Sequence, residues 1–366
     1  MKKIMCVFGT RPEAIKMCPL VYELKKEKSI ETVVCVSGQH KQMLEQVLNA
    51  FDITPDYNLD IMKDKQTLFD ITVNILTSIK SVLEDEKPDI VLVHGDTTTA
   101  YVTALACFYL KIDVAHIEAG LRTNNIYSPY PEEFNRQSIS LISKYNFAPT
   151  LRAKNNLLLE NKNEDTIYVT GNTAIDALKI TVCEDYTNPL LEWVGNSKLL
   201  LLTAHRRENL GEPMRNMFLA IKKVVEENED IKVIYPVHLN PVVQSLANEI
   251  FGNSSRVRLA APLDVIDFHN IMAKSFIILT DSGGIQEEAP SLNKPVLVMR
   301  DTTERQEGVD AGVLKLVGTD KDSIYMECTK LINDKDYYNA MTNIENPYGD
   351  GFASKRIVDV LKKIDG

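Results

Sequence analysis

Short runs rich in β-branched residues alternate with longer helical patterns along the whole chain, and this alternation restricts the fold more than any other feature. It is typical of βαβ units, in which parallel strands form a sheet that helices cover. In the first half we expect strands near Ile4–Phe8, Thr32–Val36, Asp89–Val93, Val114–Ile117, Asn146–Ala148 and Ile167–Val169. In the second half we expect them near Lys198–Leu202, Lys232–Tyr235, Arg256–Leu259, Phe276–Leu279, Pro295–Met299 and Leu314–Val317.

The chain of 366 residues has the length of two domains at about 150 residues each. Hydrophobic residues make up 44% of it, which is enough to bury a large core. We therefore predict an α/β protein with two doubly wound domains, at 1–169 and 170–351. Turn residues at 188–189 and 195–196 lie near the boundary. The amphipathic C-terminal segment, 352–366, is too short to form its own unit and should dock on one of the domains.

The acidic balance of the chain narrows the range of partners. Lys and Arg number 41 against 51 Asp and Glu, a formal net charge of −10, which disfavours nucleic acid or an anionic membrane as the main partner. The six cysteines are scattered without a Cys-x-x-Cys pair, as in proteins of a reducing compartment. Neither a signal peptide nor a run of ~18 apolar residues is recognisable. We expect a cytoplasmic protein.

Six predicted strands run directly into clusters of polar and ionisable residues. Open α/β sheets bind ligands at the carboxyl ends of their strands, so two such sheets predict a site in the cleft between the domains. Ordinary turn chemistry would explain the Gly and Thr residues of these clusters, but not five of the six histidines and the repeated Asp, Glu and Arg. The clusters are Gly9–Glu13, Ser37–His40, His94–Thr99, His116–Arg122, Thr203–Asn209 and Asp281–Gly284.

The segment 281–290 has the pattern of a strand end, a tight glycine turn and a helix start. Backbone N–H groups at Ser282, Gly283 and Gly284 could hold a phosphate, and Glu288 could accept hydrogen bonds from ribose hydroxyls. An ordinary glycine turn before a solvated acidic helix face is the alternative. Neither the P-loop nor the Gly-x-Gly-x-x-Gly pattern occurs, which disfavours ATP hydrolysis by that route and a dinucleotide site.

Two predicted helix starts carry further candidate residues. Thr10-Arg11-Pro12 is typical of a capped helix with Pro at its first position, which would direct Arg11 and Lys16 toward the cleft. At 130–136, Pro131 would open a helix with Glu132 and Glu133 in its first turn. Arg136 follows at a spacing that allows a pair with either carboxylate. A solvent-exposed Arg in a loop is the alternative for Arg11, and helix capping alone explains 130–136 at least as well as catalysis does.

Carboxylate acid/base chemistry is the type of catalysis that the motifs leave open. The histidines show no His-Glu-x-x-His or zinc spacing, and no Gly-x-Ser-x-Gly elbow occurs, so we expect no metal and no cofactor. The candidate acids and bases are Asp96, Glu118 and Glu132.

The order and spacing of these motifs resemble the non-hydrolysing UDP-N-acetylglucosamine 2-epimerases of bacteria over essentially the whole chain. The resemblance implies two Rossmann-like domains facing a central cleft, the GT-B architecture of one large class of glycosyltransferases, with the C-terminal helix returning to the first domain. It also implies a homodimer, no metal or nicotinamide, and interconversion of UDP-N-acetylglucosamine and UDP-N-acetylmannosamine for cell-surface polysaccharides. The motifs are Gly9–Glu13, His94–Asp96, His116–Arg122, Tyr130–Glu133, Thr170–Thr173, His205–Asn209, Asp281–Gly284 and Arg300–Arg305.

Epimerisation at C2 of this sugar needs more than direct deprotonation, because C2 is not next to a carbonyl group. Departure of UDP from C1 would acidify the C2–H bond, and UDP would then add back to the 2-acetamidoglucal intermediate. The resemblance places Arg11, His205, the 282–284 turn and Arg305 at the pyrophosphate. Asp96 and Glu132 are the candidates for proton transfer at C2, with Glu118 in support, and the residues leave open which carboxylate removes the proton.

The resemblance also implies a second, activating site for UDP-N-acetylglucosamine. Lys65 stands there where Arg is expected, and an ammonium cannot repeat a bidentate guanidinium contact. Gln306 similarly replaces the usual Pro after Arg305. Phe268 could pack beside the uracil or simply belong to the core. The other residues assigned to the activating site are Gln39, His40, Gln42, Arg206 and His238.

Three other functions are compatible with parts of the pattern. A retaining glycosyltransferase would hold UDP in the same way but would need an acceptor groove. A hydrolysing 2-epimerase would release free N-acetylmannosamine. A nucleotide-sugar-binding protein without turnover would use the three carboxylates only as helix caps.

Overall fold

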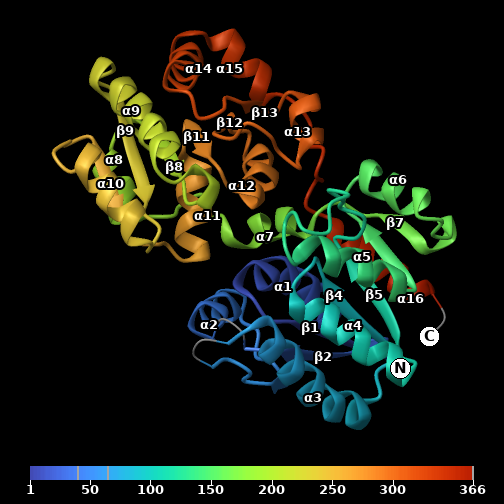
Figure 1. Ribbon diagram of the computed structural model, residues 1–366. Helices are drawn as coiled ribbons and strands as arrows, with labels where there is room; N and C mark the ends of the chain where they lie inside the picture. Colours follow the sequence, from blue (N-terminus) through green and yellow to red (C-terminus); the bar gives the residue numbers. More distant parts are fainter. Residues whose placement is uncertain (39–40, 64–65, 365–366) are drawn as a thin grey trace. The chain divides into compact units, whose positions relative to one another are not determined.

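The computed structural model describes residues 1–38, 41–63 and 66–364 and divides into two compact units (Figure 1). Unit 1 comprises Met1–Ile180 and Tyr348–Gly366, and unit 2 comprises Thr181–Pro347. The domain boundaries predicted from the sequence were 169/170 and 351/352.

Unit 1 contains a seven-stranded sheet with the order β3-β2-β1-β4-β5-β6-β7. All its neighbouring strands are parallel. From β1, the strands β2 and β3 are added on one side of the sheet, and β4 is then added on the other side of β1. The direction of winding therefore reverses between β1 and β4. Ligand sites of open α/β sheets lie at such reversals. The strands are β1 (Lys2–Phe8), β2 (Ile30–Val36), β3 (Tyr57–Asn58), β4 (Ile90–His94), β5 (Asp113–Ile117), β6 (Tyr145–Ala148) and β7 (Ile167–Val169).

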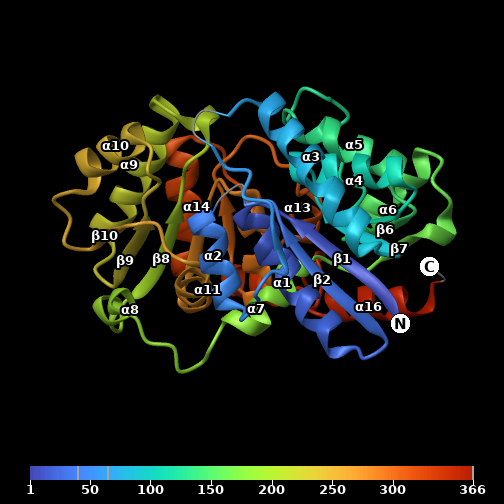
Figure 2. The same cartoon turned by 90° about the horizontal axis from the view of Figure 1, so that it is seen from below.

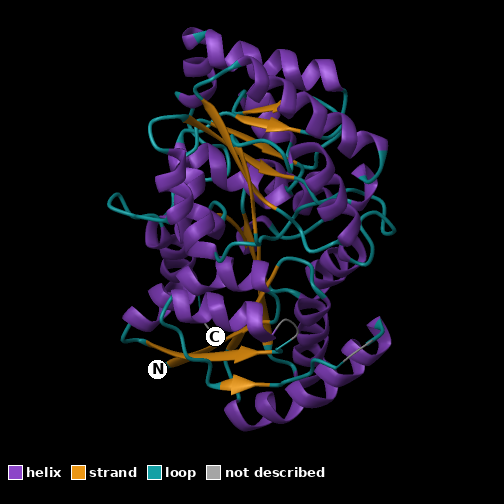
Figure 3. Cartoon of the chain, turned by 90° about the vertical axis from the view of Figure 1, so that its left-hand side faces the viewer, coloured by secondary structure: helices purple, strands orange, loops and turns teal. Residues whose placement is uncertain are grey.

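Helices cover both faces of this sheet (Figure 3). The central strands are buried on both faces, and Met5, Val7, Val91 and Val93 are fully enclosed. Each such side chain contributes roughly 1.5–3 kcal/mol through burial. The helices are α1 (Arg11–Lys26), α2 (Lys41–Ala50), α3 (Leu68–Glu86), α4 (Thr98–Leu110), α5 (Glu132–Ile142), α6 (Leu151–Leu159), α7 (Thr173–Thr181) and α16 (Ala353–Lys363), with a 3-10 turn at Glu164–Thr166.

The C-terminal helix α16 packs against α1 within unit 1 (Figure 2). Its start is fixed by the buried Asp176, whose carboxylate accepts hydrogen bonds from the backbone N–H groups of Ala353 (3.1 Å) and Ser354 (2.7 Å). Near its end, Lys362 pairs with Glu27 at 2.6 Å. These polar contacts at both ends of α16 therefore add to its packing against α1.

Unit 2 repeats the same construction with a six-stranded parallel sheet of order β10-β9-β8-β11-β12-β13. The winding reverses between β8 and β11. The strands are β8 (Lys198–Thr203), β9 (Ile231–Pro236), β10 (Val257–Ala260), β11 (Ile277–Thr280), β12 (Val296–Val298) and β13 (Leu314–Leu316). The helices are α8 (Pro189–Val194), α9 (Glu212–Glu227), α10 (Pro241–Phe251), α11 (Val265–Lys274), α12 (Gly283–Glu288), α13 (Gln306–Ala311), α14 (Lys321–Asn333) and α15 (Lys335–Thr342), with 3-10 turns at Arg207–Asn209 and Ala289–Leu292.

The predicted α/β class with two parallel sheets is confirmed, and each of the twelve predicted strands is present. The strand β3 was not predicted, because a two-residue edge strand, Tyr57–Asn58, has no β-branched run. In the described part of the chain, the structure contains no helix whose length and hydropathy would suit a membrane span.

Candidate active site

The carboxyl ends of β4 and β5 bring two of the predicted catalytic carboxylates together in unit 1. Asp96 follows β4 after Gly95, and Glu118 directly follows β5. A side chain added at Gly95 would place its Cβ 3.6 Å from Glu118 Oε1, so the two turns are neighbours. Glu118 has a φ of 64°, in the left-handed region that costs a non-glycine residue about 1–2 kcal/mol. Strain of this kind is concentrated at functional sites.

The carboxylate of Glu118 is held by a buried set of polar contacts. It forms an ion pair with Lys16 and accepts a hydrogen bond from Asn172 Nδ2 at 3.1 Å. The side chains of Lys16 and Glu118 are only 12% and 9% exposed. The ammonium group balances a charge that would be costly to bury alone, so the carboxylate has a fixed position.

Asp96 has a different partner from Glu118: its carboxylate forms an ion pair with Arg136 of α5. The same guanidinium donates to Glu133 Oε2 at 3.1 Å, and Glu133 is fully buried. The helical spacing allowed Arg136 to pair with Glu132 or Glu133, and the structure selects Glu133. Asn135 Nδ2 also donates to the backbone oxygen of Asp96 at 2.9 Å, which ties α5 to the loop after β4.

Arg11 and Glu132 are the first residues of α1 and α5, and both are half-buried. The predicted cap of α1 is present, with the Thr10 side chain accepting from Glu13 N, but α1 begins at Arg11, so Pro12 is its second residue and not its first as predicted. The helix α5 begins one residue later than predicted, because Pro131, with φ −92° and ψ 9°, precedes the first helical residue.

Glu13 lies between two of the candidate loops and was not among the predicted site residues. Its buried carboxylate accepts hydrogen bonds from Gly9 N (3.0 Å), Thr10 N (2.8 Å) and Thr10 Oγ1 (2.8 Å) on one side, and from Thr97 Oγ1 (2.7 Å) on the other. Burial raises the pKa of Glu13, and these hydrogen bonds oppose the rise. Glu13 thus links the loop that carries Arg11 to the loop that carries Asp96. The capping-box spacing of Thr10 and Glu13 was the available signal.

The two histidines of this cluster are buried and neutral. Burial lowers the pKa of His94 to about 4 and that of His116 to about 3. His116 Nε2 lies 2.7 Å from the Gly95 oxygen and so supports the turn before Asp96. Among the described residues, no group of three or more His, Cys, Asp or Glu side chains could hold a metal ion.

In unit 2, one fully buried carboxylate, Asp281, organises the loop after β8. It accepts hydrogen bonds from His205 N (3.0 Å), Arg206 N (2.9 Å) and Asn209 Nδ2 (3.1 Å). The imidazole of His205 lies 3.4 Å from Asp281 Oδ1 and stacks on His238 at a centroid distance of 5.7 Å. Burial lowers the pKa of His205, and the charge of Asp281 opposes this effect.

Arg305 lies against the glycine turn that starts α12. A Cβ built on Gly283 would lie 3.1 Å from Arg305 Cζ, so only glycine permits this close approach without displacement. The guanidinium donates from Nε to Glu287 Oε1 at 2.9 Å and from Nη1 to Glu304 Oε1 at 2.6 Å. The predicted phosphate-binding turn and Arg305 are therefore brought together, and an acidic residue, Glu304, joins them.

The third feature of unit 2 is the buried Glu288 near the end of α12. Its Oε2 lies 3.6 Å from His269 Nε2, and His269 Nδ1 lies 2.7 Å from Thr181 Oγ1. A Cβ on Gly284 would be 3.9 Å from Glu288 Oε1, so this carboxylate also neighbours the turn. Phe268 is half-buried, with its ring centroid 6.4 Å from that of His269.

The predicted activating site is described only in part. Gln39, His40 and Lys65 lie outside the described residues, and Gln42 lies in α2 at a position whose side chain is not described. Arg206 and His238 are described, and both lie next to His205.

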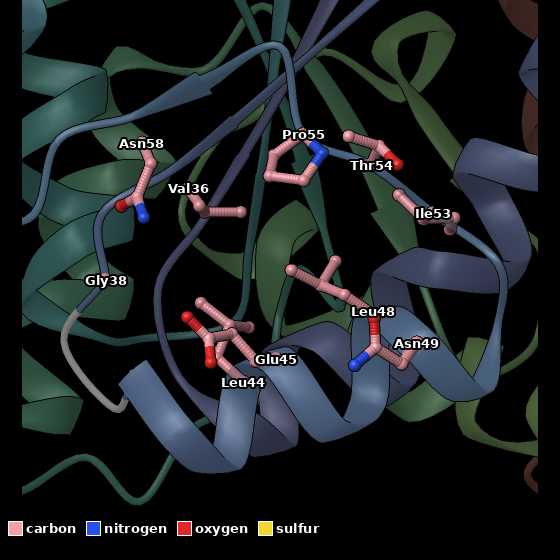
Figure 4. A pocket seen from close by; sticks show the side chains of 10 residues that line it. All are labelled: Val36, Gly38, Leu44, Glu45, Leu48, Asn49, Ile53, Thr54, Pro55 and Asn58. Carbon is pink, nitrogen blue, oxygen red and sulfur yellow. The ribbon is translucent and has the colours of Figure 1, made fainter.

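A separate cavity of about 220 Å³ lies in unit 1 between α2 and the segment that leads to β3 (Figure 4). Apolar side chains such as Leu44, Leu48 and Ile53 form its wall, and Glu45 and Asn58 add polar groups. Of the described residues that line it, none is a predicted catalytic or substrate-binding residue.

Comparison with known proteins gives concordant matches. Residues 22–362 match the family described as UDP-N-acetylglucosamine 2-epimerase. The UDP-N-acetylglucosamine 2-epimerase of Bacillus subtilis (strain 168) is 62% identical over 359 residues, covering 98% of this chain and 94% of the relative. Two solved structures are similarly close. S. aureus MnaA, solved with UDP, has a TM-score of 0.92 and 50% identity, covering 99% and 96% of the two chains. The Neisseria meningitidis UDP-GlcNAc 2-epimerase bound to UDP-GlcNAc has a TM-score of 0.91 and 51% identity, covering 99% and 100%.

Proposed function

The chain belongs to the UDP-N-acetylglucosamine 2-epimerase family and is an isomerase, and from this premise we propose how its residues convert UDP-N-acetylglucosamine into UDP-N-acetylmannosamine. In the proposed reaction, UDP leaves C1 as the C2 proton is removed. The resulting 2-acetamidoglucal is protonated on its other face, and UDP adds back at C1. No atom is gained or lost, and no oxidant is needed.

The sugar chemistry is assigned to the carboxylates of unit 1. The observation that carries this assignment is the difference between their surroundings: Glu118 is buried against Lys16, whereas Asp96 is 26% exposed and paired with Arg136. Acid and base functions at one reaction centre require carboxylates in unlike environments. Glu132, half-buried in the first turn of α5, is the third candidate and acts with Asp96 at C2. Arg11, Lys16 and Arg136 are assigned to substrate binding, and Arg136 also positions Asp96.

The nucleotide is assigned to unit 2. Arg305 and the Ser282–Gly284 turn would stabilise the charge that develops on the pyrophosphate as C1–O breaks, and His205 would donate to the same group. Glu288 would bind the ribose hydroxyls and Phe268 would lie beside the uracil. Because free UDP must add back, this site has to hold UDP after bond cleavage as well as before it.

Proton NMR of UDP-N-acetylglucosamine incubated with the protein in heavy water tests the reaction. We expect the manno isomer to form with deuterium at C2 while UDP stays attached. Free N-acetylmannosamine would indicate the hydrolysing variant, and a sample without protein is the control. If C2 stays unlabelled and no manno isomer forms, the proposal is wrong.

We also propose that the protein forms a homodimer through an apolar face of unit 1. The helices α3, α4 and α5 pack in sequence, and they expose Phe69 (84%), Phe108 (61%) and Leu141 (83%). Tyr101 of α4 and Phe134 of α5 contact each other, with ring centroids 5.6 Å apart. Exposed apolar patches of this kind mark interaction sites, and a second copy of the chain is the occupant that the family resemblance implies.

Light scattering after size exclusion should give twice the chain mass of 41.2 kDa for the native protein. The double substitution Phe69→Glu and Phe108→Glu should reduce it to one chain mass. Leu159→Glu, at a leucine that is 82% exposed on α6, is the matched control and should leave the mass doubled. A native monomer, or a double variant that stays dimeric, would contradict the proposed interface.

The cytoplasmic location is a proposal too, supported by the state of the cysteines. Cys6, Cys18, Cys35, Cys107 and Cys328 are buried free thiols, and Cys183 is an exposed one. Free thiols are maintained in reducing compartments.

A further inference from the structure

Three arginines of unit 2 converge on one carboxylate, that of Glu304. Its Oε1 accepts a hydrogen bond from Arg305 Nη1 at 2.6 Å and lies 3.5 Å from Arg206 Nη2. Its Oε2 accepts from Arg300 Nη1 at 2.9 Å. Desolvation would raise the pKa of Glu304, but the charges of these three arginines outweigh it and lower the pKa to about 2. The carboxylate is therefore ionised at neutral pH.

Glu304 lies directly at the glycine turn. A Cβ built on Gly283 would be 3.3 Å from Glu304 Oε1, about as close as it would be to the Arg305 guanidinium at 3.1 Å. Glu304 Oε1 thus contacts the Arg305 guanidinium beside the backbone of Gly283. A phosphate oxygen bound at this turn would contact the same guanidinium and the same backbone. Carboxylate and phosphate oxygens are equivalent partners for guanidinium groups.

The charges around these arginines are balanced. Arg206, Arg300 and Arg305 contribute three positive charges. Glu304 contributes one negative charge, and two more come from Glu287, which contacts Arg305 at 2.9 Å, and Glu208, which lies 3.5 Å from Arg300. The arginines therefore offer a diphosphate no net positive charge from this cluster while Glu304 remains in contact with them.

We propose that Glu304 is an internal anion that occupies a phosphate position beside Gly283 and competes with the diphosphate of UDP for Arg305. This inference rests on the proposed assignment of the 282–284 turn to the pyrophosphate. The site must retain UDP during the reaction and must also release the finished nucleotide sugar. Competition from the Glu304 carboxylate would weaken the binding of the diphosphate and so favour release.

Calorimetric titration with UDP tests the competition. Glu304→Gln keeps the size of the side chain and removes its charge, and we expect the Kd for UDP to fall about tenfold. Glu208→Gln removes a charge that contacts the same arginines from a side chain that is 58% exposed, where water screens it, and should change Kd by less than about twofold. A folded Glu304→Gln protein with an unchanged or higher Kd would show that Glu304 only supports the arginines, and the proposal would fail.

A crystal structure of the native protein with UDP provides a test that needs no variant. We expect Glu304 Oε1 to leave Arg305 Nη1, so that their separation rises from 2.6 Å to beyond hydrogen-bond distance. Persistence of this contact beside bound UDP would overturn the proposal. A native protein that epimerises its substrate but fails these tests refutes only the role of Glu304, whereas a native protein that binds no UDP refutes the proposed function as well.

Discussion

Asp96→Asn is expected to lower kcat for epimerisation by about 10²-fold or more, and Glu118→Gln and Glu132→Gln should each cause a loss of the same size. Each substitution keeps the shape of the side chain and removes its ability to accept or return a proton. In Asp96→Asn the partner Arg136 retains Glu133, so the loop after β4 should keep its position. In Glu118→Gln the buried Lys16 loses its counter-charge, so this variant should also be less stable to unfolding.

The measurement is the initial rate of UDP-N-acetylmannosamine formation, together with the rate of deuterium uptake at C2. Glu164→Gln is the control, because Glu164 is an exposed carboxylate paired with Lys154 on the same unit and should leave kcat unchanged. Thermal unfolding separates loss of chemistry from loss of fold. Near-normal turnover in all three variants would show that proton transfer at C2 depends on other groups.

The fold was predictable because parallel strands buried on both faces must be nearly continuous apolar runs. Segments such as Ile90–His94 and Ile277–Thr280 are therefore visible in sequence alone. The strand Tyr57–Asn58 was not, because a two-residue edge strand is defined by pairing with β2 and has no pattern of its own. Strand ends likewise located the polar clusters, since chain direction in a parallel sheet brings them to one edge.

Side-chain partners inside the clusters were less predictable, because they depend on contacts between distant segments. Helical spacing left Arg136 a choice between Glu132 and Glu133, and the contact with Asp96, forty residues away in sequence, fixes the geometry. Glu13 illustrates the same limit: its cap of α1 follows from local spacing, whereas its bond to Thr97 does not. Glu304 shows the same mixture, since Arg300 is only four residues before it in the same loop, whereas Arg206 comes from a separate loop.

The hydrogen bonds of Asp281 also join segments that are distant in sequence, and from them we predict the effect of Asp281→Asn. Three donors, His205 N, Arg206 N and Asn209 Nδ2, converge on this carboxylate. In Asp281→Asn these three donors, all of which reach Oδ2, would lose a charged acceptor, at a cost of about 1–3 kcal/mol in the free energy of unfolding. The loop that carries His205 would shift, and misplacement of a group at the pyrophosphate can cost about 10²-fold in kcat/KM.

A purely structural role for Asp281 would change stability and leave the pH dependence of the reaction unaltered. The charge of Asp281 raises the pKa of His205 against the lowering effect of burial, so its removal should lower that pKa further. The pKa that His205 contributes to the kcat/KM profile should then move to lower pH. Asp320→Asn is the matched control, because Asp320 is an exposed residue that accepts from Ser323 N at 2.9 Å at the start of α14. It should keep the cap, because Asn is as good a capping residue as Asp, and it should keep the native profile. If Asp281→Asn loses stability but keeps both the native kcat/KM and its native pH dependence, Asp281 does not position His205 for catalysis.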